Sequence, residues 1–372
     1  MPSAKFIRYR NQYLPFIIIW LIFGSVYSIL EFGILGDSTI YPATGNIYSP
    51  KNNVKFLIPA CLLMGLFQAY IEIGWLKKKF KNTKLWLKVL IKTLLYLLVI
   101  IVYILIVAVI NSTQTNKVGP FDAAVFKDLS NFISEFAFWS IVIYTGLGVF
   151  FALLFSEIVD YLGNGVFYNF LFGKYHKPVE EERIFMFLDM KSSTTIAEQI
   201  GHQTYFKLIS DYYADMTNAI VESYGEIYQY VGDEIVISWN ADKGIENNNC
   251  IQCLFRIEAA LIKQKKYYED TYGIFPEFKA GIHMGSVTTG EIGVLKKDII
   301  YTGDVLNTSA RIQAKCNAYN SKCIVSKVLK EALSPDDNLE FNHLGELSLK
   351  GKQIQVELFD LKLKQTGVKK WY

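Results

Sequence analysis

The sequence predicts an α+β protein in which four membrane-spanning helices precede a domain of mixed strands and helices. Hydrophobic residues make up 51% of the 372 residues and charged residues only 20%, and the hydrophobic excess is concentrated before residue 163. From residue 183 onward, short β-rich runs alternate with amphipathic helical repeats. The formal net charge of +3 lacks the strong basic bias of nucleic-acid-binding domains, so we expect no nucleic-acid partner.

Four long apolar stretches lie in residues 1–162, which we expect to form a transmembrane domain in a lipid bilayer. Each has about 20 residues or more, which is enough for a helix to cross about 30 Å of hydrocarbon. Four such runs leave almost no polar face, which argues against the buried helices of a soluble protein. The stretches are Leu14–Leu35, Lys55–Leu76, Leu87–Ile110 and Phe136–Leu162.

Basic residues in the connecting segments predict the orientation of these spans. By the positive-inside rule, the N-terminus, the second loop and everything after Leu162 face the cytoplasm of an integral cytoplasmic (inner) membrane protein. Glu31 and Glu72 lie near span ends, where a carboxylate can mark a ligand or proton site. We favour the alternative that both reach the membrane interface. The spans lack the clustered polar residues of a pore or transporter. The basic residues are Lys5, Arg8, Arg10, Lys77, Lys78, Lys79, Lys81 and Lys84.

The remaining chain divides by composition into a linker over residues 163–182, a folded domain over 183–361 and a basic tail over 362–372. Helical periodicity predicts one amphipathic helix with Phe206, Ile209, Tyr213, Met216 and Ile220 on its apolar face. Two further helices are predicted near Asn248–Tyr268 and Asn307–Ala318.

Strands are predicted from β-rich runs, and Glu226–Trp239 forms a hairpin around the Gly232-Asp233 dipeptide. The resulting β-α-β-β-α-β order is typical of a ferredoxin-like α+β fold, with helices on one face of a mostly antiparallel sheet. The other predicted strands are Arg183–Leu188, Phe278–Val287, Ile299–Tyr301, Cys323–Val325, Leu347–Leu349 and Gln355–Leu361.

Two aspartates stand at the ends of predicted strands without an obvious local cation: Asp189 after the first strand and Asp233 at the hairpin tip. Two carboxylates that converge on one sheet edge can hold two Mg²⁺ ions, with phosphates completing the coordination. The turn Ser192, Ser193 and Thr194 would offer backbone N–H groups to phosphate oxygens. Taken singly, these residues are equally typical of ordinary turns and helix caps.

Five motifs occur in order: FLDMKSST, VGDE, GIHMGSVTTGEIG, TGDVLNTSAR and LKG. This ordered set resembles the class III nucleotide cyclases, the adenylate and guanylate cyclases, over residues 183–361. The resemblance implies that Asp189 and Asp233 bind two Mg²⁺ or Mn²⁺ ions in each active site. It implies further that Asn307 orients the ribose and that Arg311 meets the α-phosphate.

The same resemblance implies that Lys350 contacts the terminal phosphates of a nucleoside triphosphate, and Lys322 lies where a further phosphate cation is often found. The family works as a head-to-tail dimer, in which one subunit supplies the metal ligands and the other supplies Asn and Arg. Because this one chain carries both sets, we expect a homodimer with two equivalent sites. The ribose 3′-oxygen attacks the α-phosphorus in line, and pyrophosphate leaves.

The base-reading positions depart from the family. Gln229 stands where adenylate cyclases have Lys and guanylate cyclases have Glu, and Ile300 stands where Asp or Thr is usual. Gln both donates and accepts, so Gln229 is compatible with several bases. Asp298 lies two residues earlier on the same strand face and would need a local bulge to take part. ATP is the favoured substrate on family frequency alone.

Three other functions stay open: a guanylate or other nucleotide cyclase, a membrane receptor with an inactive nucleotide-binding cyclase-like domain, and a diguanylate cyclase. The last is indicated by the GDE sequence at Gly232–Glu234, although LNTSAR and LKG have no role there. We also expect the four spans to act as a dimerising sensor, with Leu162–Glu182 passing helix movement to the cyclase dimer. The sequence does not identify the ligand that the membrane domain would sense.

Overall fold

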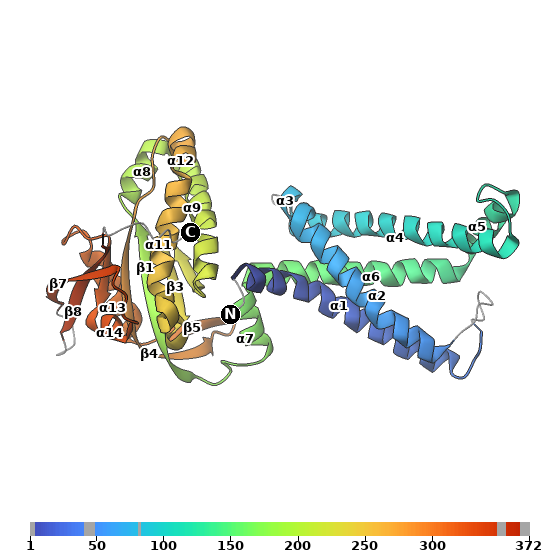
Figure 1. The fold of residues 1–372 in the computed structure, drawn as a ribbon, viewed down its shortest axis with the longest axis horizontal. Coiled ribbons are helices and arrows are strands. Elements are labelled where there is room, and N and C mark those ends of the chain that lie inside the picture. Colours follow the sequence, from blue (N-terminus) through green and yellow to red (C-terminus); the bar gives the residue numbers. More distant parts are fainter. Residues whose placement is uncertain (1–3, 41–48, 81–82, 348–354, 365–372) are drawn as a thin grey trace. The chain divides into compact units, whose positions relative to one another are not determined.

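The computed structural model describes residues 4–40, 49–80, 83–347 and 355–364 (Figure 1). The chain forms two compact units, one of Arg8–Phe167 and the other of Tyr168–Tyr372 together with Met1–Ile7. The first is helical and the second contains the sheet, in agreement with the predicted α+β class.

Within the described residues, the first unit has four helices long and apolar enough to cross a membrane. They correspond to the four predicted stretches, and no more than 39% of the apolar window of any of them is buried. The apolar side chains that stay outside the packed interior are suited to lipid and not to water. The helical backbone satisfies its own hydrogen bonds, which a bilayer requires. The helices are α1 (Ala4–Leu35), α2 (Pro50–Ile71) with the π-helical η1 (Glu72–Leu76), α4 (Leu85–Asn116) and α6 (Phe136–Leu162).

Shorter helices fill segments that sequence patterns left as loops. The third loop contains α5 (Ala123–Ser134), which Asp122 caps by accepting a hydrogen bond from the Ala124 N–H at 2.9 Å. The second loop begins with α3 (Lys77–Lys79), and the linker contains α7 (Asn164–Leu171).

The structure also contradicts two expectations about polar residues in the spans. Glu72 does not reach the interface: it is buried against Lys92 of α4, and Glu157 of α6 lies within 3.4 Å of the same lysine. The spans therefore do contain a polar cluster. Its members are far apart in sequence, so hydropathy averaged along one helix could not reveal it.

The second unit is built on one sheet, for which the described residues supply eight strands. The order β2-β3-β1-β4 is antiparallel throughout and confirms the ferredoxin-like core. These strands are β1 (Val179–Met190), β2 (Glu226–Val231), β3 (Glu234–Asn240) and β4 (Phe278–Ile292).

Four more strands extend this core: β6 pairs parallel with β4, β8 and β7 follow it outward, and β5 pairs with the far half of β4. Their bounds are β5 (Asp298–Thr302), β6 (Cys323–Ser326), β7 (Leu339–Leu347) and β8 (Val356–Leu363). The helices of this unit are α8 (Ser193–Ile200), α9 (His202–Glu222), α10 (Ala241–Ile245), α11 (Asn249–Lys263), α12 (Lys265–Tyr272), α13 (Asp304–Lys315) and α14 (Lys327–Ala332), with a 3-10 turn η2 (Glu246–Asn248).

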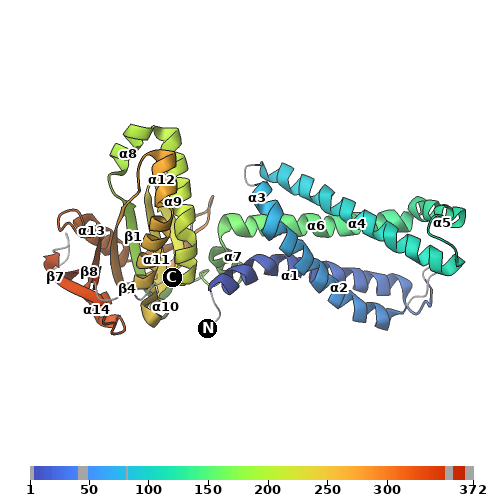
Figure 2. The same cartoon turned by 45° about the horizontal axis from the view of Figure 1, so that its top comes forward.

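Alternation along β1 sends its side chains to two different layers, because successive residues of a strand face opposite sides. Ile184, Met186 and Leu188 pack in the core beneath α9 and α11 (Figure 2). Phe185 and Phe187 point the other way and contact a smaller core that includes Val305 of α13. Helices therefore cover both faces of the sheet, although only one covered face was expected.

Three predicted details differ in the structure. On α9, the predicted core residues Met216 and Ile220 are buried, whereas Phe206 is 76% exposed. Leu208, Tyr212 and Ala219 complete the buried face. β1 starts at Val179 because the acidic run before Arg183 pairs with an extension of β4. β7 ends where the predicted strand Leu347–Leu349 begins, and the last two residues of that prediction lie outside the described residues.

Candidate active site

The structure brings Asp189 and Asp233 together at one edge of the sheet. Asp189 lies near the end of β1, opposite Glu234 of β3. Asp233 follows Gly232, whose φ of +63° is a left-handed conformation that glycine adopts without strain. Burial and a hydrogen bond with Asp189 raise the pKa of Asp233 above its ordinary value. The Oδ2 atom of Asp233 is buried and has no hydrogen-bond partner among the described residues.

Two donors from other elements converge on Asp189. The Lys279 ammonium of β4 lies 3.2 Å from Asp189 Oδ2, and Gln313 Nε2 of α13 donates to the same oxygen at 3.1 Å. The expectation that Asp189 lacks a nearby cation was therefore wrong, because Lys279 comes from the strand paired alongside. Sequence reasoning missed both residues, since they are brought to Asp189 by strand register and helix packing and not by a local motif.

A third carboxyl, that of Glu234, borders the pair. Burial, together with the neighbouring charges of Asp189 and Asp233, raises the pKa of Glu234 to about 7. The edge is thus rich in carboxyl groups that repel one another when ionised.

This donor set fits a hard divalent cation. Aspartate oxygens are the ligands that Mg²⁺ and Mn²⁺ favour, and the unpartnered Asp233 Oδ2 is an acceptor that a cation would satisfy. Within the described part of the chain, no group of three His, Cys, Asp or Glu side chains is arranged to hold a metal ion. Phosphate oxygens, waters or backbone carbonyls would therefore have to supply the remaining ligands.

The Ser/Thr turn after Asp189 borders the carboxyl pair. Ser192 has a φ of 56° and precedes α8, yet its side chain makes no capping hydrogen bond. Ser193 hydrogen-bonds to the Asp233 carboxyl, whereas Thr194 is exposed. The uncapped first turn of α8 leaves N–H groups that phosphate oxygens could accept from.

Asn307 and Arg311 lie on the exposed face of α13, and neither has a hydrogen-bond or ion-pair partner among the described residues. Arg311 and Gln313 are two residues apart, which separates them by about 200° around the helix axis. Because Gln313 faces Asp189, Arg311 points away from it. A single chain therefore does not bring Arg311 to the aspartates.

The two base-reading positions lie on separate edge strands. Gln229 is exposed on β2, directly after a β-bulge, and Ile300 is half-buried in β5 opposite Gly290. Asp298 does not replace Ile300, because the β4–β5 register is continuous and Asp298 instead pairs with Lys296 at 2.7 Å.

The two remaining predicted lysines do not join the aspartates in the structure. The Lys322 ammonium lies 2.5 Å from Glu258 of α11 and 4.8 Å from the centre of the Phe278 ring. Phe278 belongs to the core beneath α9 and α11, which is the sheet face opposite to Gln313. Lys350 lies outside the described residues.

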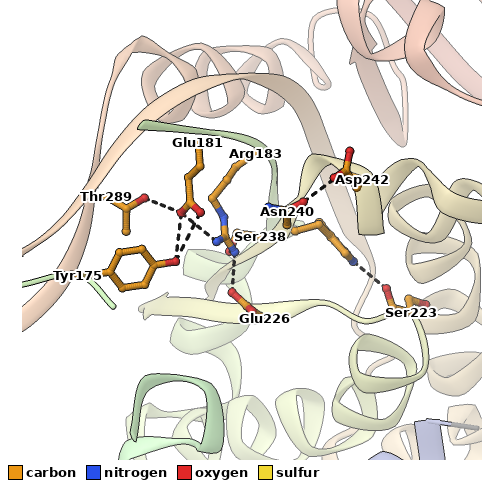
Figure 3. A network of polar contacts seen from close by, with 10 residues as sticks. Tyr175, Glu181, Arg183, Ser223, Glu226, Ser238, Asn240, Asp242 and Thr289 are labelled. Atoms are coloured by element: carbon orange, nitrogen blue, oxygen red, sulfur yellow. Dashed lines mark hydrogen bonds and ion pairs between the residues drawn. The ribbon is translucent and has the colours of Figure 1, made fainter. Parts of the chain in front are cut away.

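At the opposite end of β1, a buried arginine ties four strands together (Figure 3). Arg183 donates to Glu181 at 3.2 Å, to Glu226 of β2 at 2.5 Å and to Ser238 of β3 at 3.1 Å. Thr289 of β4 donates to the same Glu181 carboxylate at 2.6 Å. The Tyr301 ring of β5 lies 4.6 Å from the guanidinium, so this network also supports the strand that carries Ile300.

We expect Arg183→Met to lower the free energy of unfolding by about 3 kcal/mol, because it leaves the partly buried carboxylate of Glu181 without its cation. Native-state hydrogen exchange of the full chain should show this as faster opening of β1 and β4 amides. Lys243→Met removes an exposed i,i+3 ion pair and should leave the same amides unchanged. Equal protection in both variants would contradict the role given to Arg183.

Comparison with known proteins identifies the family of this domain. Residues 175–362, half of the chain, match the family described as the adenylate and guanylate cyclase catalytic domain. The chain belongs to this family. The cyclase domain accounts for the whole sheet and for both aspartates.

Curated relatives of the cyclase domain include two proteins named adenylate cyclase from one bacterial strain. Adenylate cyclase 2 of Rhizobium meliloti (strain 1021) is 34% identical over 189 residues, which cover 51% of this chain and 52% of the relative. Adenylate cyclase 1 of the same strain is 26% identical over 188 residues, which cover 49% of this chain and 27% of the relative. This chain thus spans about half, or less, of the length of these relatives.

Among solved structures, a bacterial light-regulated adenylyl cyclase has the same fold, with a TM-score of 0.52 and 21% identity. The similarity covers 61% of this chain and 66% of that chain.

Proposed function

We propose that this chain is a membrane-anchored nucleotide cyclase that converts ATP into cyclic AMP and pyrophosphate at a homodimer interface. The observation that carries the proposal is the pair Asp189 and Asp233, which converge beside Lys279 in a chain of the cyclase family. ATP is the proposed substrate because the matched curated relatives are named adenylate cyclases.

Two Mg²⁺ or Mn²⁺ ions, when bound, would lower the barrier by activating the attacking ribose oxygen and neutralising the leaving pyrophosphate. Asp189 and Asp233 would hold them through carboxylate oxygens. Lys279 already lies at this edge as a cation and is placed to meet a phosphate once Asp189 is engaged. The backbone N–H groups in the first turn of α8 would donate hydrogen bonds to further phosphate oxygens.

The remaining roles fall to residues that a second copy of the chain would supply. Arg311 is suited to a forked contact with the α-phosphate, and Asn307, one helical turn away, would hold the ribose. Lys350 would meet the terminal phosphates. Little covalent chemistry is required of these side chains, because positioning and charge stabilisation provide the rate enhancement.

A head-to-tail homodimer is proposed because Arg311 faces away from Asp189 in its own chain. A two-fold axis would place the exposed α13 face of one copy over the aspartates of the other and create two equivalent sites.

The proposed location is the cytoplasmic membrane, with the N-terminus and the cyclase domain in the cytoplasm. Four apolar helices support the membrane assignment, and the lysines of α3 support the orientation. The membrane unit is also the proposed place for a sensed ligand.

The test is incubation of the full-length protein in membranes with ATP, GTP, CTP and UTP in turn, with Mn²⁺ or Mg²⁺ and product identification by mass spectrometry. Cyclic AMP from ATP supports the proposal. Cyclic GMP as the main product would indicate a guanylate cyclase. This alternative is open because Gln229 and Ile300 match neither the adenylate nor the guanylate pattern. Nucleotide binding without turnover would indicate a receptor with an inactive domain, and cyclic di-GMP would indicate a diguanylate cyclase.

We expect Gln229→Ala to weaken base selection without abolishing turnover. Gln229 is exposed on β2 and is the polar member of the base-reading pair, so its loss should lower the ratio of kcat/KM for ATP over GTP by about 5-fold, the value of one hydrogen bond. Gln264→Ala, between α11 and α12, is the matched control and should leave the ratio unchanged. An unaltered ratio in Gln229→Ala would show that other residues read the base.

A further inference from the structure

The buried face of α13 carries a glutamine that the proposed mechanism does not use. Gln313 is 6% exposed, and its amide donates to Asp189 Oδ2 at 3.1 Å. The backbones of α13 and β4 approach each other closely here, since a Cβ added to Gly281 of β4 would lie 2.3 Å from the Gln313 backbone nitrogen. The position of the amide relative to the sheet is therefore fixed by packing.

We propose that Gln313 is a positioning residue that holds Asp189 ready for the metal ions, an inference that rests on the proposed function. Gln313 and Lys279 both contact Oδ2, so neither of them occupies the other carboxylate oxygen of Asp189. Lys279 carries a charge that an incoming phosphate would attract, whereas the neutral amide has no such competitor. Gln313 also connects Asp189 to the helix that bears Asn307 and Arg311.

The test is Mn²⁺ binding to the full-length protein in detergent, measured without nucleotide by electron paramagnetic resonance. Gln313→Met keeps the length of the side chain and removes the donor, and we expect the Kd for Mn²⁺ to rise about 5-fold. Thr308→Val is the matched control: Thr308 is buried on the same helix but bonds to Asp304, so its loss should leave the Kd unchanged.

A Kd for Mn²⁺ that stays within about 2-fold in Gln313→Met would overturn this assignment, since one lost hydrogen bond should exceed that change. So would an equal rise in Thr308→Val, which would indicate general loosening of α13. Because binding is measured without turnover, this result is independent of whether the protein cyclises ATP.

A second inference comes from the membrane unit, where four charged side chains are buried together. We call Glu72, Lys88, Lys92 and Glu157 the ionic cluster; each is less than 9% exposed. Lys92 pairs with Glu72 and lies 3.4 Å from Glu157, and Lys88 lies 2.8 Å from Glu157. The two positive and two negative charges balance.

The ionic cluster joins three helical segments of the membrane unit, η1, α4 and α6. Glu72 begins the π-helical continuation of α2, the two lysines lie in the first turns of α4, and Glu157 lies near the end of α6. One turn beyond it, Lys77 and Asp160 form a more exposed pair at 2.5 Å. α6 is the helix from which the chain continues through α7 into β1.

One oxygen of the ionic cluster, Glu72 Oε2, is buried without a hydrogen-bond partner among the described residues. The same holds for Gln68 Nε2 and Thr93 Oγ1, which lie outside the cluster but close to its members in sequence. Glu72 also starts a π-helical segment, an uncommon geometry that often marks functional positions. Charges inside a membrane are costly unless paired, so rearrangement would proceed between discrete pairings and not by gradual drift.

We infer that the ionic cluster is a switch that fixes the end of α6 against α2 and α4 and so sets the output of the cyclase domain. This inference rests on the proposed function for its readout. A change of pairing would shift or rotate the end of α6, and catalytic geometry is sensitive to misplacements of about 1 Å.

The test variant is Lys88→Met combined with Glu157→Gln, which removes one charge of each sign and leaves the pair of Glu72 and Lys92. In full-length protein in membranes, we expect cyclase activity per inserted molecule to fall at least about 5-fold, in line with loss of active-site alignment. Hydrogen exchange at the end of α6 should become faster, a readout that needs no enzyme activity.

Asp128→Asn is the matched control, because Asp128 joins α5 to the far end of α4 through Ser112 and Asn116. It should leave both readouts unchanged. Unchanged activity in the inserted double variant would overturn the inference. If that variant fails to insert, Lys88→Arg with Glu157→Asp replaces it, because it keeps both charges of this pair and changes only the pairing geometry, and full activity with unchanged α6 exchange there would overturn the inference equally.

Discussion

Asp233→Asn should reduce ATP cyclisation by at least about 10³-fold, because loss of metal binding removes several kcal/mol of transition-state stabilisation. Asp233 lies at the tip of the β2–β3 turn, and its Oδ2 atom has no hydrogen-bond partner among the described residues. Its hydrogen bonds to Asp189 and Ser193 join residues that lie outside the hydrophobic cores of the domain. Asparagine keeps the size of the side chain and is tolerated in turns, so the fold should survive. The measurement is the initial rate of cyclic AMP formation by full-length protein in membranes.

Asp242→Asn provides the matched control for this experiment. Asp242 lies in the first turn of α10, beyond the other end of β3, and is exposed. It should retain full activity, and hydrogen exchange of the β1, β3 and β4 amides should be equal in the two variants. Activity above about one-tenth of wild type in Asp233→Asn would show that this carboxylate is not an essential metal ligand.

The features that the sequence predicted correctly have local signals. Four apolar runs identify the spans, because each run is long enough by itself. The Gly232-Asp233 dipeptide identifies the hairpin, because the turn needs a residue with positive φ. The β-α-β-β-α-β order of elements along the chain was also predicted, because strands and helices have different hydrophobic periods.

The features that could not be predicted from the sequence depend on contacts between distant segments. Lys279 and Gln313 reach Asp189 only because β4 pairs with β1 in one register and α13 packs on that face. Lys322 immediately precedes β6, and its ammonium lies over Phe278 on the other face of the sheet. The apolar face of α9 was ambiguous because two apolar rows run beside each other, and only packing shows that Phe206 is outside.

The second large effect concerns two inactive variants that should restore activity when they are mixed. Arg311→Ala leaves the aspartates intact, and Asp189→Asn leaves Arg311 intact. In a head-to-tail dimer of one chain of each kind, one site combines the intact aspartates with the intact arginine, and the other site carries both lesions. Random pairing makes half of the dimers mixed, so co-expression should recover about one-quarter of wild-type activity.

Each variant alone should be nearly inactive, so the recovered signal stands against a low background. The control is co-expression of Asp189→Asn with Asp233→Asn, since both lesions fall on the metal-binding side and no mixed dimer contains an intact site. Differently tagged chains that co-purify would show that mixed dimers form. Recovery in the first mixture and not in the second would require Arg311 to act across the subunit boundary, as its orientation away from Asp189 predicts. Absence of recovery despite co-purification would place Arg311 in the site of its own chain, which the helix geometry does not allow without rotation of α13.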